Sequence, residues 1–175
     1  MKHAFLGWLM ITSSSAFGAD HQPSLAALAT QYMQAYSAWD IPAMSQLQHA
    51  NIHFNDPTAT DAFGRSFSHR GKAEVATFLS GIFGENKPQH LTFKVKEQFV
   101  SGNHVVIHAT FESVLPDAWY GERATGPVLV SIPITTVLVF ADQQIISHTD
   151  YADYASYQQQ INWQLAPAKN TNEKP

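Results

Sequence analysis

The end of the sequence restricts the fold most strongly, because it holds two long apolar segments separated by a short turn. Val128–Phe140 alternates as a strand, four polar or small residues follow, and Ile145–Tyr151 alternates again. This pattern predicts a closing β-hairpin. Strand alternation directs Ile146, His148 and Asp150 to one face of it. A carboxylate at the end of a buried strand is costly unless it is paired or chemically useful, so the hairpin also indicates a pocket.

Helical and extended patterns precede this hairpin in separate blocks. The expected helices are Leu25–Trp39, a shorter one that Asp40 caps and that runs to about Gln48, and Lys72–Phe83. The expected strands are Asn51–Asn55, Leu91–Val100 and His104–Leu115, with loops over residues 58–69 and 116–127. Residues 154–163 suit a last helical turn or a tail, and Pro133 predicts a bulge or an edge position in its strand. Helices and strands segregated in this way predict an α+β fold, with N-terminal helices packed on a strongly curved, mainly antiparallel sheet.

Composition limits the chain to one mildly acidic domain. Of its 175 residues 45% are hydrophobic, and the formal net charge is −4. This length and apolar content suffice for one core, which we place at residues 19–165, and the acidic balance argues against a nucleic-acid partner. There is no cysteine, so disulfide scaffolds and cysteine nucleophiles are excluded. The polar end of the chain, residues 166–175, is predicted to be disordered.

The first 18 residues have the three parts of a secretory signal peptide. Lys2 gives a positive start, Ala4–Ile11 is apolar, and Ala16-Phe17-Gly18 is the best cleavage motif. The alternative is a buried N-terminal helix, but eight apolar residues are too few to span a membrane. We therefore expect the mature chain to be periplasmic or secreted and to have no membrane span.

The order of elements and several short motifs resemble the SnoaL-like group of the nuclear transport factor two-like superfamily. The resemblance covers roughly residues 24–160. It is carried by Trp39-Asp40, Phe54-Asn55-Asp56-Pro57, Arg70-Gly71-Lys72, the helix end Phe78-Leu79-Ser80-Gly81-Ile82-Phe83, and Thr149-Asp150-Tyr151-x-Asp153. It implies a cone-shaped, cystatin-like roll around an apolar cavity, often in a homodimer. Relatives include polyketide cyclases, limonene epoxide hydrolases, ketosteroid isomerases and non-catalytic domains, so the fold alone does not decide the function.

Asp150 is the first catalytic candidate, because a carboxylate inside an apolar cavity suits acid–base chemistry. The resemblance supports this role, since the hydrolase and cyclase branches have an acidic residue in the last hairpin strand. His148 is two residues away on the same face, roughly 6–7 Å along the strand, and we expect it to assist. The alternatives are structural: a carboxylate that fixes the exit from the sheet, and a buried histidine.

Glu112 and Asn55 are the other catalytic candidates. The resemblance implies an Arg-x-Asp pair on a middle strand, but this chain has Thr110-Phe111-Glu112, which keeps the acid without the arginine. It also pairs Asn55 with His53, a substrate-binding candidate, on the first strand. His104 and His108 precede Glu112 at steps of four, about 13 Å along a strand, too far for one metal ion. We expect neither a metal nor a cofactor.

Aromatic residues complete the predicted pocket. The substrate-binding candidates besides His53 are Trp39, Tyr32, Phe78 and Trp119, although aromatic residues of this kind often belong simply to the core. Two functions remain open at this point. One is cofactor-free acid–base catalysis on a small hydrophobic molecule, of the isomerase, cyclase or epoxide-hydrolase type. The other is an exported ligand-binding or assembly domain without catalysis.

Overall fold

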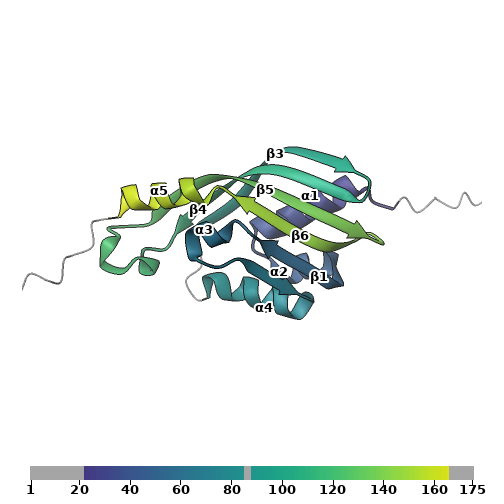
Figure 1. Cartoon of the computed structure of the whole chain (residues 1–175), viewed down its shortest axis with the longest axis horizontal. Coiled ribbons are helices and arrows are strands. Elements are labelled where there is room, and N and C mark those ends of the chain that lie inside the picture. The colour runs from purple at the N-terminus through teal and green to yellow at the C-terminus, as the bar shows by residue number, and fades with distance from the viewer. Residues whose placement is uncertain (1–21, 85–87, 166–175) are drawn as a thin grey trace, which may run out of the picture.

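The computed structural model describes residues 22–84 and 88–165, and these form helices packed on a curved six-stranded sheet (Figure 1). The helices are α1 (Leu25–Ser37), α2 (Ile41–Leu47), α3 (Ala59–Phe63), α4 (Lys72–Phe83) and α5 (Tyr154–Gln164). The strands are β1 (Gln48–Asp56), β2 (Phe67–Arg70), β3 (His90–Ser101), β4 (His104–Leu115), β5 (Val128–Ala141) and β6 (Gln144–Ala152). Two short 3-10 turns, Asp117–Trp119 and Gly121–Arg123, lie between β4 and β5. No helix in the described parts of the chain is long and apolar enough to cross a membrane.

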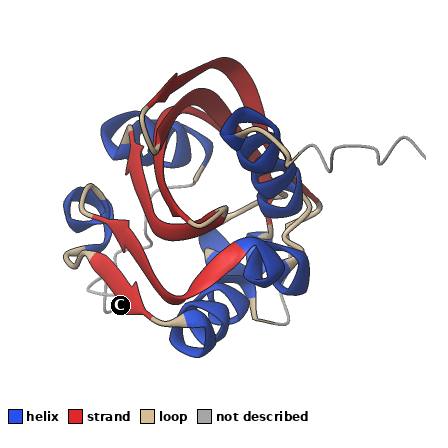
Figure 2. Cartoon of the chain, turned by 90° about the vertical axis from the view of Figure 1, so that its right-hand side faces the viewer, coloured by secondary structure: helices blue, strands red, loops and turns tan. Residues whose placement is uncertain are grey.

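The strands follow the order β2-β1-β6-β5-β4-β3, and only β1 and β6 run parallel. The sheet curls without closing, and α1 lies against its concave side (Figure 2). The predicted α+β class with a mainly antiparallel curved sheet is confirmed. The predicted hairpins are confirmed as well, β3 with β4 and β5 with β6.

Local sequence explains the first two helices. The Ser24 side chain accepts a hydrogen bond from the Ala27 amide at the start of α1, and Asp40 does the same for Ala43 at the start of α2. These are N-caps, which satisfy amides that have no partner inside the helix. The apolar stripe of α1 is buried on the concave face, where it forms the main core with β4, β5 and β6.

Two expectations were wrong in detail. The expected loop over residues 58–69 contains α3 and the short edge strand β2, which pairs with β1. In β6, the register shifts between Val139 and Phe140, so that Ser147 pairs with the former and Ile145 with the latter. Ile146 is the extra residue of this bulge, and it is Ile145 that is buried with His148 and Asp150. A bulge changes which residues face the core, and simple alternation does not predict it.

Pro133 lies in the first part of β5, which is at an edge of the sheet. The rest of β5 lies between two strands, β4 and β6. β6 pairs with β5 only over Ile134–Ala141, so the segment of β5 before it has β4 as its single strand neighbour. The missing amide of Pro133 therefore breaks no ladder hydrogen bond to β6. One of the two predicted explanations of this proline, the edge position, is confirmed.

Candidate functional site

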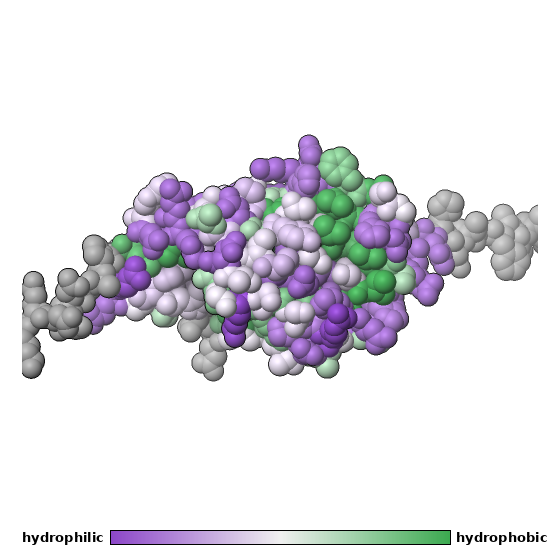
Figure 3. All heavy atoms as spheres, viewed as in Figure 1, coloured by the Kyte–Doolittle hydropathy of each residue, from purple (hydrophilic) through white to green (hydrophobic). Residues whose placement is uncertain are grey.

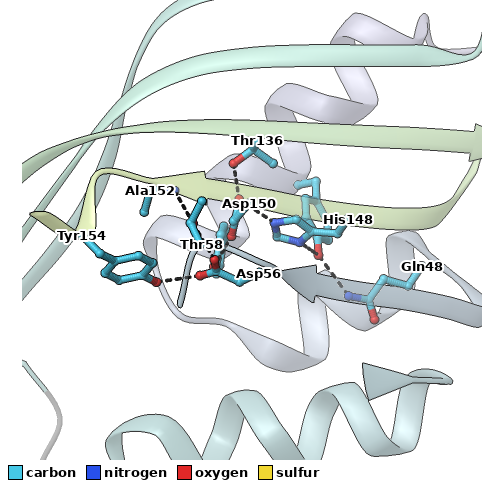
Figure 4. Close-up of polar contacts among 10 residues, drawn as sticks. Gln48, Asp56, Thr58, Thr136, His148, Asp150, Ala152 and Tyr154 are labelled. Atoms are coloured by element: carbon cyan, nitrogen blue, oxygen red, sulfur yellow. Dashed lines mark hydrogen bonds and ion pairs between the residues drawn. The ribbon is translucent and has the colours of Figure 1, made fainter. Parts of the chain in front are cut away.

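A buried polar network lies on the concave side of the sheet, centred on His148 and Asp150 of β6 (Figure 4). The bulge in β6 and the pairing of Asp150 with Thr136 of β5 direct these side chains toward α1. His148 is fully buried and Asp150 is 2% exposed. Polar groups at this depth require internal hydrogen-bond partners, and α1, β1 and β5 supply them.

Asp150 accepts hydrogen bonds from two buried hydroxyls. Tyr36 of α1 donates to Oδ2 at 2.9 Å, and Thr136 donates to Oδ1 in a short hydrogen bond. Burial raises the pKa of Tyr36, and the neighbouring Asp150 carboxylate raises it further, so the phenol keeps its proton. Tyr36 therefore acts as a permanent donor to the carboxylate.

His148 connects the carboxylate to a second tyrosine. Its Nδ1 lies 2.9 Å from the hydroxyl of Tyr32, and the side-chain amide of Gln48 donates to that same hydroxyl at 3.0 Å. Because the amide nitrogen only donates, the oxygen of Tyr32 accepts from Gln48, and the tautomer of His148 decides whether the Tyr32 hydroxyl donates to Nδ1 or accepts from it. The other ring nitrogen, Nε2, faces Asp150.

The contact between His148 and Asp150 is electrostatic rather than a well-aligned hydrogen bond. Nε2 lies 3.0 Å from Oδ1, but the N–H direction misses the oxygen, so Nε2 has no aligned acceptor. A buried donor without an aligned acceptor is uncommon, and here it lies beside the carboxylate. A carboxylate beside an imidazole is the composition of an acid–base site.

A second buried carboxylate, Asp56, lies at the end of β1 close to this network (Figure 4). It accepts hydrogen bonds from Thr58 Oγ1 at 2.8 Å, from the Ala59 amide at 3.0 Å and from the Tyr154 hydroxyl at 2.6 Å. Burial raises the pKa of Asp56, the hydrogen bonds partly oppose this, and the charge of Asp150 adds to it. The site therefore contains two carboxylates near enough to affect each other.

The structure does not bring Glu112 to Asp150. Ile107 pairs with Thr136 and shares the concave face with it, whereas Glu112, five residues further along β4, faces the outer side. There its Oε2 lies 2.6 Å from the Lys94 ammonium, and it lines a surface hollow of about 340 Å³. The second acid beside Asp150 is Asp56 instead.

Asn55 and His53 also face away from the network. The buried residues of β1 at this end are Ile52, Phe54 and Asp56, and the two candidates alternate with them. His53 Nε2 lies 2.9 Å from the Ser68 hydroxyl, and burial together with the nearby Arg70 lowers the pKa of His53. Apolar alternation through Ile52 and Phe54 is the sequence signal that would have assigned Asp56 to the inner face.

The predicted aromatic residues have different surroundings. Tyr32 belongs to the polar network. Trp39 is half-buried, with its ring centroid 5.5 Å from Tyr36 and 4.6 Å from Phe83, and Trp119 stacks on Phe83 from the outside at 5.6 Å. Phe78 packs on Phe54, which in turn contacts the His148 ring at 4.8 Å. Their assignment as substrate contacts stays a prediction.

Sequence reasoning missed several members of the network. These are Tyr36, Gln48, Thr58, Thr136 and Tyr154. Asp56 belongs to the Phe54-Asn55-Asp56-Pro57 motif but was not among the predicted site residues. Tyr36 was visible as part of the α1 stripe, four residues after Tyr32, but an apolar stripe does not indicate a hydroxyl partner. The described residues contain no group of three histidine or acidic side chains that could hold a metal ion.

Comparison with known proteins identifies the family. The model of the SnoaL-like domain matches residues 29–148. This chain belongs to the SnoaL-like domain family. The match includes most of α1, all of β1 and most of β6, although Asp150 lies just beyond its end. No curated protein matches the sequence.

Solved structures agree on the fold. A protein from Shewanella denitrificans named as a SnoaL-like polyketide cyclase is 23% identical, with a TM-score of 0.70 over 82% of this chain and 100% of its own. One of the same description from Shewanella putrefaciens is 21% identical, with a TM-score of 0.69 and the same coverage. An LEH-like epoxide hydrolase from M. tuberculosis is 16% identical, with a TM-score of 0.61 over 80% of this chain and 90% of its own. At these identities the similarity shows the shared fold.

Proposed function

We propose that this SnoaL-like domain binds a small hydrophobic molecule on the concave side of its sheet and acts on it by cofactor-free acid–base catalysis. The observation that carries the proposal is the buried Asp150 carboxylate, held between two hydroxyls and beside the Nε2 of His148. A carboxylate whose position is fixed on several sides is suited to take and return a proton without reorganisation. The residues packed around it are aromatic and aliphatic, which favours an apolar ligand.

Asp150 and Asp56 take different roles in this proposal. Asp150 accepts a proton from the ligand or from water, and Tyr36 and Thr136 stabilise its charge. Asp56, with its raised pKa, supplies or receives the second proton. Two carboxylates with different surroundings divide acid and base roles in this way. A reaction of the isomerase, cyclase or epoxide-hydrolase type needs no more than these two transfers.

Asp150→Asn is the variant that tests catalysis, with Glu112→Gln as the matched control on the outer face. The probes are limonene 1,2-epoxide, for water addition, and a small cyclic ketone in D₂O, for proton exchange at carbon. We expect Asp150→Asn to lose about 10²–10⁴-fold in turnover of a probe that the wild type converts, while its affinity in calorimetry stays unchanged. Glu112→Gln keeps both. Equal turnover by wild type and Asp150→Asn contradicts the assignment.

Binding without catalysis is the second candidate, and one observation favours it. The partners of Asp150 all come from the protein itself, and the residue is closed off from solvent, as a structural carboxylate would be. A wild type that binds both probes and converts neither supports this function and contradicts the catalytic one.

Export and dimer formation are also part of the proposal. The signal-peptide pattern of residues 1–18 lies outside the described residues, and N-terminal sequencing of the exported protein tests it. The outer face of the sheet has an exposed Phe99 beside Val106 and Val137, and apolar surface gathers toward one end of the molecule (Figure 3). A homodimer built on this face would bury it. We expect a dimer in sedimentation at micromolar concentration and a shift toward monomer in Phe99→Asp, and a monomeric wild type contradicts the proposal.

A further inference from the structure

Helix α5 covers a free strand edge with its side chains. Where β6 ends, the residues Leu129 and Ser131 of β5 present their amides and carbonyls to no strand. The amide of Gln164 donates to the Leu129 carbonyl at 2.6 Å and accepts from the Leu129 amide at 2.9 Å. Gln160 makes the same two contacts with Ser131, both at 2.8 Å. Glutamines four apart on a helix are spaced about as closely as residues two apart on a strand, which explains the fit.

Pro133 is the next residue of β5 whose backbone faces this edge, and it too is satisfied from the α5 side. Pro133 has no amide hydrogen, and its carbonyl accepts a hydrogen bond at 3.0 Å from the amide of Asp153, the N-cap of α5. Every backbone group on this side of β5 from Leu129 to Pro133 is therefore satisfied by α5 or its cap. An open strand edge would be a site for pairing with another chain, so the helix replaces a strand here.

Few apolar contacts hold α5 on the sheet. Ile161 is its one buried residue, followed by Leu165 just after the helix, and both pack on Leu115, Val128 and Val130. The half-buried ring of Tyr157 joins this cluster and lies 6.0 Å from Phe63 of α3. Trp163 is 74% exposed. By contrast, α1 buries six residues in the main core. Because water can replace the glutamine hydrogen bonds at small net cost, α5 should separate from the sheet more easily than α1.

The first turn of α5 also contacts the candidate site. The hydroxyl of Tyr154 donates to Asp56, and its ring packs against Phe63 of α3 at 5.4 Å. The chain enters the helix through Asp153, whose side chain caps it by accepting from the Ser156 amide. Movement of α5 about this residue would break the contact between Tyr154 and Asp56.

We infer that α5 is a lid that opens about Asp153, uncovers the Val128–Val130 end of the concave face and releases Asp56, giving a small hydrophobic ligand its way in. The inference rests on the proposed function for the identity of what enters. The closed state of the site supports it, since His148 and Asp150 have almost no contact with solvent and a ligand needs an opening to reach them. The opening itself needs no ligand and can be measured alone.

The absence of cysteine makes the test direct, because a single introduced thiol is the only one present. Val130→Cys places it under α5, and Val105→Cys places it in the main core under the other helices. Both valines are buried and face the same side of the sheet, so the two variants are matched. Labelling by a thiol reagent under native conditions should be at least about tenfold faster at position 130.

The glutamine contacts are tested in the same background. Gln160→Leu with Gln164→Leu removes the four hydrogen bonds to β5, together with the one from Gln164 to the Gln160 carbonyl. It should speed labelling at position 130 by a further factor of about ten, with no change at position 105. Gln159→Leu is the control, since the Gln159 side chain is exposed and makes no hydrogen bond or ion pair within the described residues. Equal labelling rates at the two cysteines, or an equal increase of both rates in the glutamine variant, contradict the proposal that α5 is a lid. Fast labelling at position 130 together with full turnover by Asp150→Asn supports the opening of α5 but refutes the catalytic proposal.

Discussion

Thr136→Val removes one donor from Asp150 and changes almost nothing else. Thr136 is completely buried on the concave face, and its hydroxyl donates to Oδ1. Valine keeps the branched shape, so the substitution leaves no cavity, but Asp150 then retains Tyr36 as its one well-aligned donor. A hydrogen bond to a charged group contributes about 1.5–3 kcal/mol, and we expect the free energy of unfolding to fall by that amount.

This loss is large enough to measure by urea unfolding followed by circular dichroism. For a domain of this size each kcal/mol corresponds to about 2–4 °C, so the melting temperature should fall by about 3–12 °C. Thr135→Val is the matched control: Thr135 lies on the outer face, and its side chain makes no hydrogen bond within the described residues. It should change stability by less than about 0.5 kcal/mol. A Thr136→Val protein as stable as wild type would refute the view that the Thr136 hydroxyl holds a charged Asp150.

Asp56 and Glu112 give two further predictions. Burial raises the pKa of Asp56 in the folded state, so this residue favours folding most at low pH and loses that contribution as the pH rises through its folded pKa. Urea unfolding should therefore show Asp56→Asn gaining stability relative to wild type as the pH rises from about 4 to 8, and a constant difference contradicts the assignment. For Glu112→Gln we expect a loss of less than about 1 kcal/mol, because its pair with Lys94 is at the surface, and a larger loss in the same assay contradicts that placement.

The sequence was sufficient for the architecture because its signals are local. Apolar spacing located α1 and α4, the caps at Ser24 and Asp40 located helix starts, and the turn near Gly102 located the β3–β4 hairpin. Each of these features depends on residues within a few positions of one another. Motif order then indicated the family, which the match over residues 29–148 confirmed.

The site was harder to predict from the sequence because it depends on contacts between distant segments. Tyr32 and Tyr36 reach His148 and Asp150 across more than a hundred residues, and the bulge at Ile146 decides what faces them. Alternation within a single strand also does not tell which face of the sheet is the concave one, and Glu112 was a candidate for that reason. Only the register with β5 assigns it to the outer side.

The role of α5 could not be predicted from periodicity. Its glutamines are polar residues on a short helix, a pattern that usually means a solvated face. They have defined hydrogen-bond partners only because the free edge of β5 lies opposite them. That edge exists because β6 pairs no further than Ile134. An edge of this kind is a property of the whole sheet.

Nitrogen NMR of the His148 side chain tests the central claim most directly, that His148 and Asp150 form one acid–base unit in which Nε2 presents a proton to the carboxylate. Protein labelled with ¹⁵N-histidine is compared with a His148→Gln variant, which identifies the signals of this one buried ring among nine histidines. The account predicts an unprotonated Nδ1, which accepts from Tyr32, and a protonated Nε2. A proton on Nδ1 with a bare Nε2 would contradict the arrangement and, with it, the assignment of His148 and Asp150 as one acid–base unit.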